Sequence, residues 1–186
     1  MSTPPEHSIL LSPIGDIDTS FFQSICGGIH SVFGYPVEII PLIQDVSFAF
    51  DPGRNQYHST LILEKLDAEA PGRTIKLLAV TEVDLFIPIL THVYGEAQIG
   101  GKASIISSYR LKEGLNPINP RETFSIRLIK EALHELGHTF SLLHCKDSAC
   151  IMHYCRSISD VDRKSDQLCR YCKVLLEDEI RRLALT

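Results

Sequence analysis

The sequence predicts an α/β (α+β) fold, in which a mixed, twisted sheet with an antiparallel edge strand is backed by helices and followed by a small C-terminal subdomain. Short apolar runs alternate with helical patterns over residues 8–80, which is typical of a mostly parallel sheet. Two later strand-like runs are joined by a glycine pair, which indicates an antiparallel ribbon. Regular periodicity is then lost over residues 144–172. The 186 residues are close to the usual size of one domain. We therefore expect a single domain over 1–186, with an upper part at 1–143 and a lower part at 144–186.

The first elements follow from apolar spacing. We expect strands over residues 8–14, 37–43 and 74–80 and helices over residues 18–33 and 57–70. The run at 37–43 is nearly continuous in apolar residues, which is typical of a buried strand. Gly34 stands where the C-terminal cap of the first helix belongs, because glycine adopts the left-handed conformation readily.

The later elements include the edge strand and the longest helix. Residues 93–99 and 103–109 are the two strand-like runs, and Gly100-Gly101 lies between them. A helix should begin at Asn119-Pro120, with asparagine as the cap, proline at the first helical position and Glu122 completing a capping box. It should run to about Leu143, because four apolar residues form one stripe along it: Leu128, Ala132, Leu136 and Phe140. Residues 173–184 are predicted to form a closing amphipathic helix.

Charge and composition exclude several classes of protein. The chain has 18 Lys and Arg against 23 Asp and Glu, a net charge of -5, which argues against general attraction to nucleic acid or anionic membrane. Its apolar runs are too short to span a bilayer, and residues 1–16 lack the basic start of a signal peptide. We therefore expect a cytoplasmic protein without a membrane partner, and a monomer.

An HExxH sequence, His134-Glu135-Leu136-Gly137-His138, lies well inside the long helix. Residues four apart share one helix face, so both imidazoles can bind one metal ion. Glu135 is turned away from that ion by one position, but it can hold a metal-bound water and accept its proton. The same five residues also fit a helix with two half-exposed histidines beside a solvated glutamate.

A third histidine extends the pattern to His134-Glu135-x-x-His138-x-x-Ser141-x-x-His144, which resembles the extended zinc-binding motif of the metzincins. The third ring reaches the same ion only if the helix ends sharply, and glycine usually makes that bend. This chain has Ser141 there. Either the serine adopts the left-handed conformation at a cost of about 1 kcal/mol, or the helix continues and His144 never reaches the metal. We favour the first alternative, because downstream residues also fit.

Those downstream residues are Met152 and Tyr154. Metzincins place a methionine in a tight turn beneath the zinc site, and Met152 lies at a suitable distance after His144. Tyr154 resembles the tyrosine of astacins and serralysins, which lies at the metal or stabilises the oxyanion. The resemblance implies such a catalytic role for Tyr154, and simple packing is the alternative.

Four cysteines form a second candidate metal site. Cys145-x4-Cys150 and Cys169-x2-Cys172 are two ligand pairs separated by 18 residues, which suits one tetrahedral structural zinc. Two disulfides or free thiols are the alternative. Six basic residues could offset the thiolate charge: Lys146, Arg156, Arg163, Lys164, Arg170 and Lys173. Cys155 is left over as a free thiol. Cys145 directly follows His144, so we expect the cluster to brace the third histidine.

The combined pattern HExxHxxxxxHC, a second cysteine after four residues, x-Met and a final CxxC resembles the archaemetzincins. The resemblance implies a metzincin-like domain with two Zn²⁺ per chain. It assigns the catalytic zinc to His134, His138 and His144, acid–base chemistry to Glu135, and a structural zinc in the lower part of the domain to the cysteines at 145, 150, 169 and 172. The chain departs from the family pattern at three positions: Ser141 for glycine, Cys155 for serine and Leu168 for phenylalanine.

We therefore expect a zinc-dependent metallopeptidase that hydrolyses peptide or protein substrates by a zinc-bound water activated by Glu135. The substrate should lie extended along the edge strand near residues 93–99. The alternative is a non-catalytic zinc-binding module for protein or nucleic-acid interaction, acting through the basic residues of the segment 145–173. Nucleic acid is the weaker form of this alternative, because six Lys and Arg stand against four Asp there and aromatic residues are few. The module also leaves Glu135 without a role.

Overall fold

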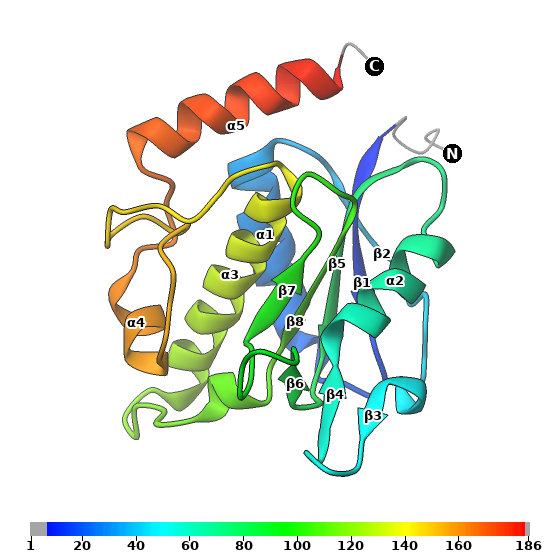
Figure 1. The fold of residues 1–186 in the computed structure, drawn as a ribbon. Helices are drawn as coiled ribbons and strands as arrows, with labels where there is room; N and C mark the ends of the chain where they lie inside the picture. The colour runs from blue at the N-terminus through cyan, green and yellow to red at the C-terminus, as the bar shows by residue number, and fades with distance from the viewer. Residues whose placement is uncertain (1–6, 185–186) are drawn as a thin grey trace.

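The computed structural model describes residues 7–184, and at its centre lies a five-stranded sheet in the order β2-β1-β5-β8-β7 (Figure 1). Its strands are β1 (Ser8–Pro13), β2 (Val37–Ile39), β5 (Thr74–Thr81), β7 (Gly95–Ala97) and β8 (Ala103–Ser107). Neighbouring strands from β2 to β8 pair in parallel, whereas β7 pairs antiparallel with β8 and ends the sheet. The predicted mixed sheet with an antiparallel edge strand is confirmed.

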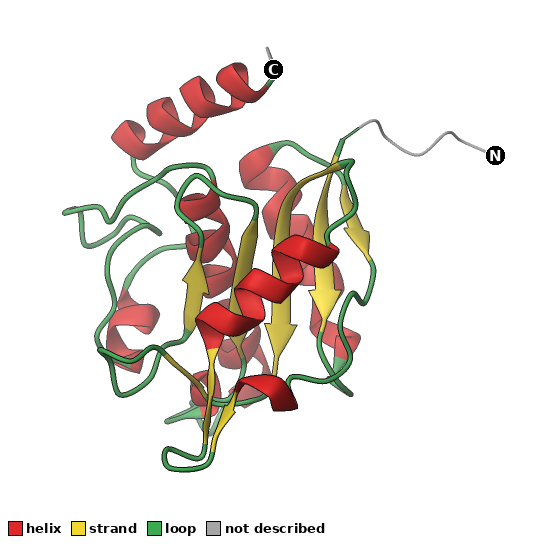
Figure 2. Cartoon of the chain, turned by 45° about the vertical axis from the view of Figure 1, so that its right-hand side comes forward, coloured by secondary structure: helices red, strands yellow, loops and turns green. Residues whose placement is uncertain are grey.

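Helices cover both faces of this sheet (Figure 2). They are α1 (Phe22–Phe33), α2 (Ser59–Glu69), α3 (Pro120–Thr139), α4 (Ile158–Arg163) and α5 (Arg170–Leu183), with short 3-10 turns η1 (Thr19–Phe21), η2 (Ser47–Ala49) and η3 (Arg110–Lys112). α2 lies on one face, and α1 and α3 lie side by side on the other. α5 crosses above the C-terminal end of α3 (Figure 1).

The hydrophobic core has two parts because the strand side chains alternate between the two faces. Along β5, Leu77 and Ala79 pack in the α2 cluster, whereas Leu78 and Val80 pack in the cluster with α1 and α3. The second cluster also includes buried residues of the C-terminal segment, such as Met152. The helix α3 is therefore packed between the sheet and the segment that follows it.

A second, three-stranded sheet had no counterpart among the predicted elements. It consists of β3 (Phe50–Asp51), β4 (Gln56–His58) and β6 (Leu85–Phe86), in that order. The turn-rich loop 51–55 connects β3 to β4. These strands are two or three residues long, so they carry too little periodicity to be recognised.

Several element boundaries differ from the prediction. β2 is an edge strand of three residues, and Ile39 is 50% exposed, so the expected buried strand over 37–43 is wrong. Of the run 93–99 only Gly95–Ala97 is a strand. α4 lies inside the segment predicted to be irregular, where Ser157 and Asp160 form its capping box.

The start of α3 is correct in position but not in its cap. Pro120 occupies the first turn as expected, but the Asn119 side chain makes no capping hydrogen bond, so the predicted capping box with Glu122 is wrong. Thr123 Oγ1 instead donates to the carbonyl of Asn119 over 3.0 Å.

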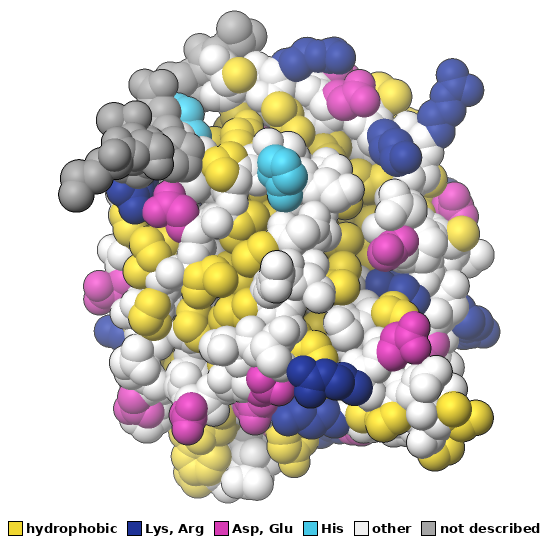
Figure 3. Space-filling view, turned by 180° about the vertical axis from the view of Figure 1, so that it is seen from behind, with side chains coloured by type: hydrophobic (Ala, Val, Ile, Leu, Met, Phe, Trp, Pro, Cys, Tyr) yellow, Lys and Arg dark blue, Asp and Glu magenta, His cyan; other side chains and the backbone are white. Residues whose placement is uncertain are grey.

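Within residues 7–184, no helix combines the length and the apolar character that a membrane span requires. On the face shown in Figure 3, acidic and basic side chains are interspersed rather than separated by sign.

Candidate metal centre

His134 and His138 lie one turn apart on α3 with their rings directed to the same point. His134 Nδ1 lies 2.8 Å from the carbonyl oxygen of Ile151, and His138 Nδ1 lies 2.7 Å from that of Leu142. A carbonyl only accepts, so each Nδ1 carries the hydrogen and each Nε2 keeps a free lone pair. The two Nε2 atoms are 3.2 Å apart. Lone pairs at this separation repel one another unless they share a cation, so the pair fits a metal ion.

The chain reverses direction directly after α3, and Ser141 makes the reversal possible. Its φ angle is +63°, in the left-handed region. The amide of Ser141 donates to the carbonyl of His138 over 3.0 Å, and the amide of Leu142 donates to that of Gly137 over 3.1 Å. These two bonds form a Schellman motif in which serine takes the usual place of glycine. The first alternative for Ser141 therefore holds, and α3 ends at Thr139 rather than near Leu143.

This reversal brings His144 to the other two histidines. Its ring centroid lies 5.4 Å from that of His134 and 4.8 Å from that of His138. One nitrogen of each of the three rings lies within 4.8 Å of the others. Three imidazole nitrogens at such separations could hold one metal ion, and they fit the donor set of a catalytic zinc with room for one further ligand.

The protonation state of the three rings suits metal binding. Burial lowers the pKa of His134 well below its usual value, and the nearby charge of Lys164 lowers it further. Burial lowers the pKa of His138 to about 4 and also lowers the pKa of His144. All three imidazoles are therefore neutral at neutral pH, which is the form that binds a metal ion.

Met152 lies beneath the helix, as the resemblance to metzincins implies. It is fully buried, and a Cβ atom on Gly137 would lie only 2.4 Å from its Sδ atom. Gly137 thus permits the thioether to approach the helix between the two histidines. The amide of Cys145 donates to the carbonyl of Met152 over 2.9 Å, which ties this turn to the residue after His144.

The side chain of Glu135 extends from α3 toward the edge strand β7. A Cβ atom on Gly95 would lie 2.6 Å from Glu135 Cγ and 2.7 Å from the carbonyl oxygen of Ile105, so glycine is required at this position. Burial raises the pKa of Glu135 well above its usual range, and the charge of Glu131 adds to the rise. A carboxylate with a raised proton affinity is suited to take a proton from water.

A buried ion pair stands beside these residues. Lys164 Nζ lies 2.8 Å from Glu131 Oε1, with 0% and 4% of the two side chains exposed. The expectation that Lys164 offsets the thiolate charge is therefore wrong, because its charge is directed at Glu131. Arg163 is likewise paired with Asp160 rather than with the cysteines.

The three histidines and Glu135 line one cleft of about 680 Å³. The edge strand forms one wall, and the segment after Met152 forms the opposite one. Tyr154 lies on that second wall, 43% exposed, with its ring 4.9 Å from that of His144. The predicted residues of the catalytic site are therefore brought together around one solvent-accessible space.

The four cysteines form a separate cluster, with all four Sγ atoms within 4.8 Å of one another. Every one of these thiols is free, and the Sγ atoms of Cys145 and Cys169 are 3.8 Å apart, well beyond a disulfide bond. Cys169 is the N-cap of α5, and its Sγ atom accepts a hydrogen bond from the amide of Cys172. Hydrogen bonds from Cys172 and its neighbours lower the pKa of Cys169. Four sulfur atoms without a cationic partner in the described residues fit a structural zinc ion.

Sequence reasoning missed the residues that make room for this chemistry. Gly95 and Gly137 permit the close approach of Glu135 and Met152, and the pair of Glu131 and Lys164 borders the site. A glycine inside a strand-like run is a known sign of close backbone approach, so Gly95 could have been found. The pairing of Lys164 with Glu131 has no such local sign.

Comparison with known proteins finds one family. The model of peptidase family M54 matches residues 61–178. The archaemetzincin of Methanocaldococcus jannaschii is 37% identical over 171 residues, covering 91% of this chain and 93% of the relative. That of Pyrococcus furiosus is 35% identical over 181 residues, with 94% of each chain covered.

Solved structures agree with these relatives. The crystal structure of archaemetzincin from Methanopyrus kandleri has a TM-score of 0.84 at 30% identity and covers 98% of this chain and 100% of that one. The archaemetzincin from Archaeoglobus fulgidus, complexed with malonate, has a TM-score of 0.77 at 32% identity, covering 90% and 99% of the two chains.

Proposed function

The chain belongs to peptidase family M54 and is a zinc metallopeptidase, and we propose that it hydrolyses peptide bonds with Glu135 as the general base. The ligands of the catalytic zinc are then His134, His138 and His144. The observation that carries this proposal is the pair of Nε2 lone pairs 3.2 Å apart beside a buried carboxylate in an open cleft. Zinc bound there supplies Lewis-acid chemistry, which polarises the scissile carbonyl and lowers the pKa of water.

The protein side chains perform the remaining steps. Glu135 takes a proton from the attacking water and passes it to the leaving amine, since its pKa is raised by burial. Tyr154 donates its phenolic hydrogen toward the oxyanion from the opposite wall of the cleft. The carbonyl oxygens of Ile151 and Leu142 hold two histidine rings in the tautomer that presents Nε2.

The substrate binds as an additional strand along β7. Within the described residues β7 pairs only with β8, so its outer edge has backbone groups available for an extended peptide. Gly95 brings this edge close to Glu135. A peptide hydrogen-bonded along β7 would therefore present a carbonyl to the metal centre.

A second zinc is bound by Cys145, Cys150, Cys169 and Cys172 and is structural. Four protein ligands complete a tetrahedral site and leave no position for substrate. Two Zn²⁺ per chain are accordingly expected by elemental analysis.

The test of the proposal is hydrolysis of a mixed peptide library by the zinc-loaded wild type and by Glu135→Ala. Loss of the general base should lower kcat/KM by about 10²–10⁴-fold with zinc content unchanged. Glu122→Ala is the matched control, because Glu122 is exposed at the other end of the same helix. Equal rates for wild type and Glu135→Ala would refute the assigned role.

Tyr154→Phe tests the tyrosine separately. It removes only the hydroxyl, so the expected result is a lower kcat with KM and zinc content nearly unchanged. An unchanged kcat would restrict Tyr154 to a packing role.

A further inference from the structure

The loop between β6 and β7 forms the rim of the cleft. Ile87 and Leu90 are among the lining residues of the cleft, and Leu90 is 38% exposed. Ile89, between them, is 86% exposed and does not line it. The ends of the loop are closed by the amide of Val93, which donates to the carbonyl of Leu85 over 2.9 Å. The loop therefore presents two apolar side chains to the cleft from a closed base.

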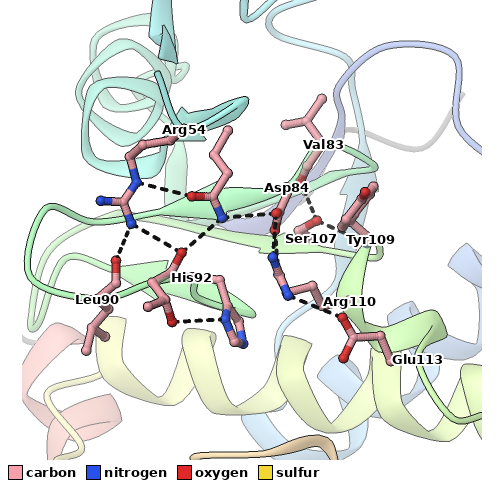
Figure 4. Close-up of polar contacts among 11 residues, drawn as sticks. Arg54, Val83, Asp84, Leu90, His92, Ser107, Tyr109, Arg110 and Glu113 are labelled. Carbon is pink, nitrogen blue, oxygen red and sulfur yellow. Dashed lines mark hydrogen bonds and ion pairs between the residues drawn. The ribbon is translucent and has the colours of Figure 1, made fainter. Parts of the chain in front are cut away.

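Arg54, in the turn between β3 and β4, holds this rim (Figure 4). Its Nη2 atom donates to the carbonyl of Leu90 over 2.7 Å and to that of Thr91 over 3.2 Å. Gln56 Nε2 adds a bond of 3.0 Å to the carbonyl of Thr91. The guanidinium also lies over the ring of Phe86, 4.3 Å from its centroid. In the part of the chain that the structure describes, Arg54 has no carboxylate partner. Its guanidinium group is therefore available to donate to the loop carbonyls.

Further charged groups keep Arg54 and Gln56 in place. Arg54 Nε donates to Gln56 Oε1 over 3.1 Å, and Gln56 Nε2 donates to Asp84 Oδ2 over 3.0 Å. Arg110 holds Asp84 with two bonds of 2.7 Å each. Asn55, beside Arg54, has a φ of +52°, a conformation that costs a non-glycine residue about 1 kcal/mol. Arg54 and Gln56 thus bind the backbone of one short loop, and Asp84 and Arg110 hold Gln56 in place from two other segments.

We propose that Ile87 and Leu90 determine substrate specificity by receiving a bulky apolar side chain of the peptide, with Arg54 acting as the positioning residue. This inference rests on the proposed peptidase function of the same cleft. Contact between these apolar side chains and an apolar substrate group favours binding, because both surfaces are removed from water. The free energy of binding is more favourable when the loop is ordered beforehand, since less conformational entropy is then lost. The hydrogen bonds from Arg54 and Gln56 to the loop carbonyls keep the loop ordered before the substrate binds.

Leu90→Asp and Ile89→Asp are the matched variants that test the rim. Both place a charge on the same loop, but only residue 90 lines the cleft. The wild type should cleave library peptides with leucine or phenylalanine at one position in preference to serine or aspartate. Leu90→Asp should raise KM for those peptides about tenfold while kcat changes little, and Ile89→Asp should retain the wild-type profile. The same cleavage profile in both variants would overturn the proposal.

Arg54→Met tests the hydrogen bonds of Arg54 to the loop, since it keeps an unbranched apolar side chain but removes the guanidinium donors. Amide hydrogen exchange of residues 90–92 should become faster, and the preference for apolar side chains should fall about threefold to tenfold. Unchanged exchange and an unchanged profile would overturn the positioning role of Arg54.

A binding measurement separates this proposal from the general-base assignment. Zinc-loaded Glu135→Ala is titrated with fluorescent leucine-containing and serine-containing peptides, alone and combined with Leu90→Asp or Ile89→Asp. A preference for the leucine peptide that only Leu90→Asp abolishes supports the rim, whatever the result of the hydrolysis assay. Equal binding of the two peptides overturns it.

Discussion

Gly137 shows how the absence of one Cβ atom determines the packing of the metal centre. Alanine there would favour the helix by about 1 kcal/mol through propensity alone. Its Cβ atom would, however, lie 2.4 Å from Met152 Sδ and 3.6 Å from Leu142 Cδ1. Overpacking of this kind costs about 1–3 kcal/mol. We therefore expect Gly137→Ala to lower the free energy of unfolding, measured by urea denaturation, and to weaken zinc retention.

The control for this change is a shortened Met152 side chain. In a Met152→Ala background the clash is absent, so Gly137→Ala should be neutral or stabilising there. A Gly137→Ala protein as stable as the wild type would show that the methionine moves aside freely.

Ser141 is the second position where one residue carries a strained conformation. With φ at +63°, serine is about 1 kcal/mol less favourable than glycine. Within the described residues its side chain makes one hydrogen bond, a long one of 3.3 Å from Ser141 Oγ to Glu179 Oε1. Ser141→Gly should therefore raise the free energy of unfolding by up to about 1 kcal/mol and leave zinc content unchanged. Ser141→Val, which is β-branched, should lower stability, and the opposite order of the two variants in thermal unfolding would contradict this account.

The helix α3 ends against a lysine from the sheet. Lys76 Nζ donates to the carbonyl of Thr139 over 2.6 Å and to that of Gly101 over 2.8 Å, and lies 5.1 Å from the centroid of the Phe140 ring. A cation at a helix C-terminus is favourable because the last carbonyl groups carry partial negative charge. Lys76 thus joins the end of α3 to the turn after the edge strand.

Burial lowers the pKa of Lys76 to about 8, with Glu179 opposing the shift. Below pH 8 the lysine is protonated in both the folded and the unfolded chain, so folding bears the full cost of burying the charge. Between pH 8 and about 10.5 the folded chain releases the proton while the unfolded chain retains it, so this cost falls as pH rises. A neutral amine still has two hydrogens for the two carbonyls.

Lys76→Met tests this linkage. The stability of the wild type relative to the variant should increase from pH 7 to pH 10, by an amount on the order of 3 kcal/mol or less. Urea denaturation of both proteins at several pH values measures the difference, and other titrating groups cancel in the comparison. Lys102→Met serves as the control. A pH-independent difference for Lys76→Met would contradict the buried-charge account.

Considered over the entire fold, the two candidate metal sites share one segment of chain. His144 and Cys145 are adjacent and belong to different donor sets. The amide of Cys145 bonds to Met152, and His153 Nδ1 lies 3.1 Å from the carbonyl of Cys145. A change at the cysteine cluster should therefore move the third histidine.

Removal of Cys169 and Cys172 tests this coupling. The double variant Cys169→Ser/Cys172→Ser should lose zinc from both sites, because the brace on Cys145 is lost with the cluster. Zinc per chain measured by elemental analysis should fall from two toward zero. Cys26→Ser, outside the cluster, should retain both ions. Retention of one full equivalent by the double variant would show that the sites are independent.

Much of the fold followed from periodicity. The strands near residues 8–13, 74–81 and 103–107 and the helices α1, α2, α3 and α5 were predicted within a few residues of their observed bounds. The features that the prediction missed are short elements or the ends of elements. They are the small sheet, the length of β2, the end of α3 and the helix α4. Two or three residues carry no periodic signal, and the end of α3 is set by contacts that local spacing does not contain.

The identity of the residues that carry the chemistry of the two candidate metal sites follows from the sequence alone. The spacing of His134 and His138 is meaningful because it matches one turn of a helix, which is a local property of the chain. The contacts that surround these residues are found only in the folded chain: Gly95 makes room for Glu135, Lys164 pairs with Glu131, and Arg54 donates to the carbonyl groups of the rim loop. These contacts join residues from separate elements. Their existence depends on how the whole core packs, and no local pattern encodes that.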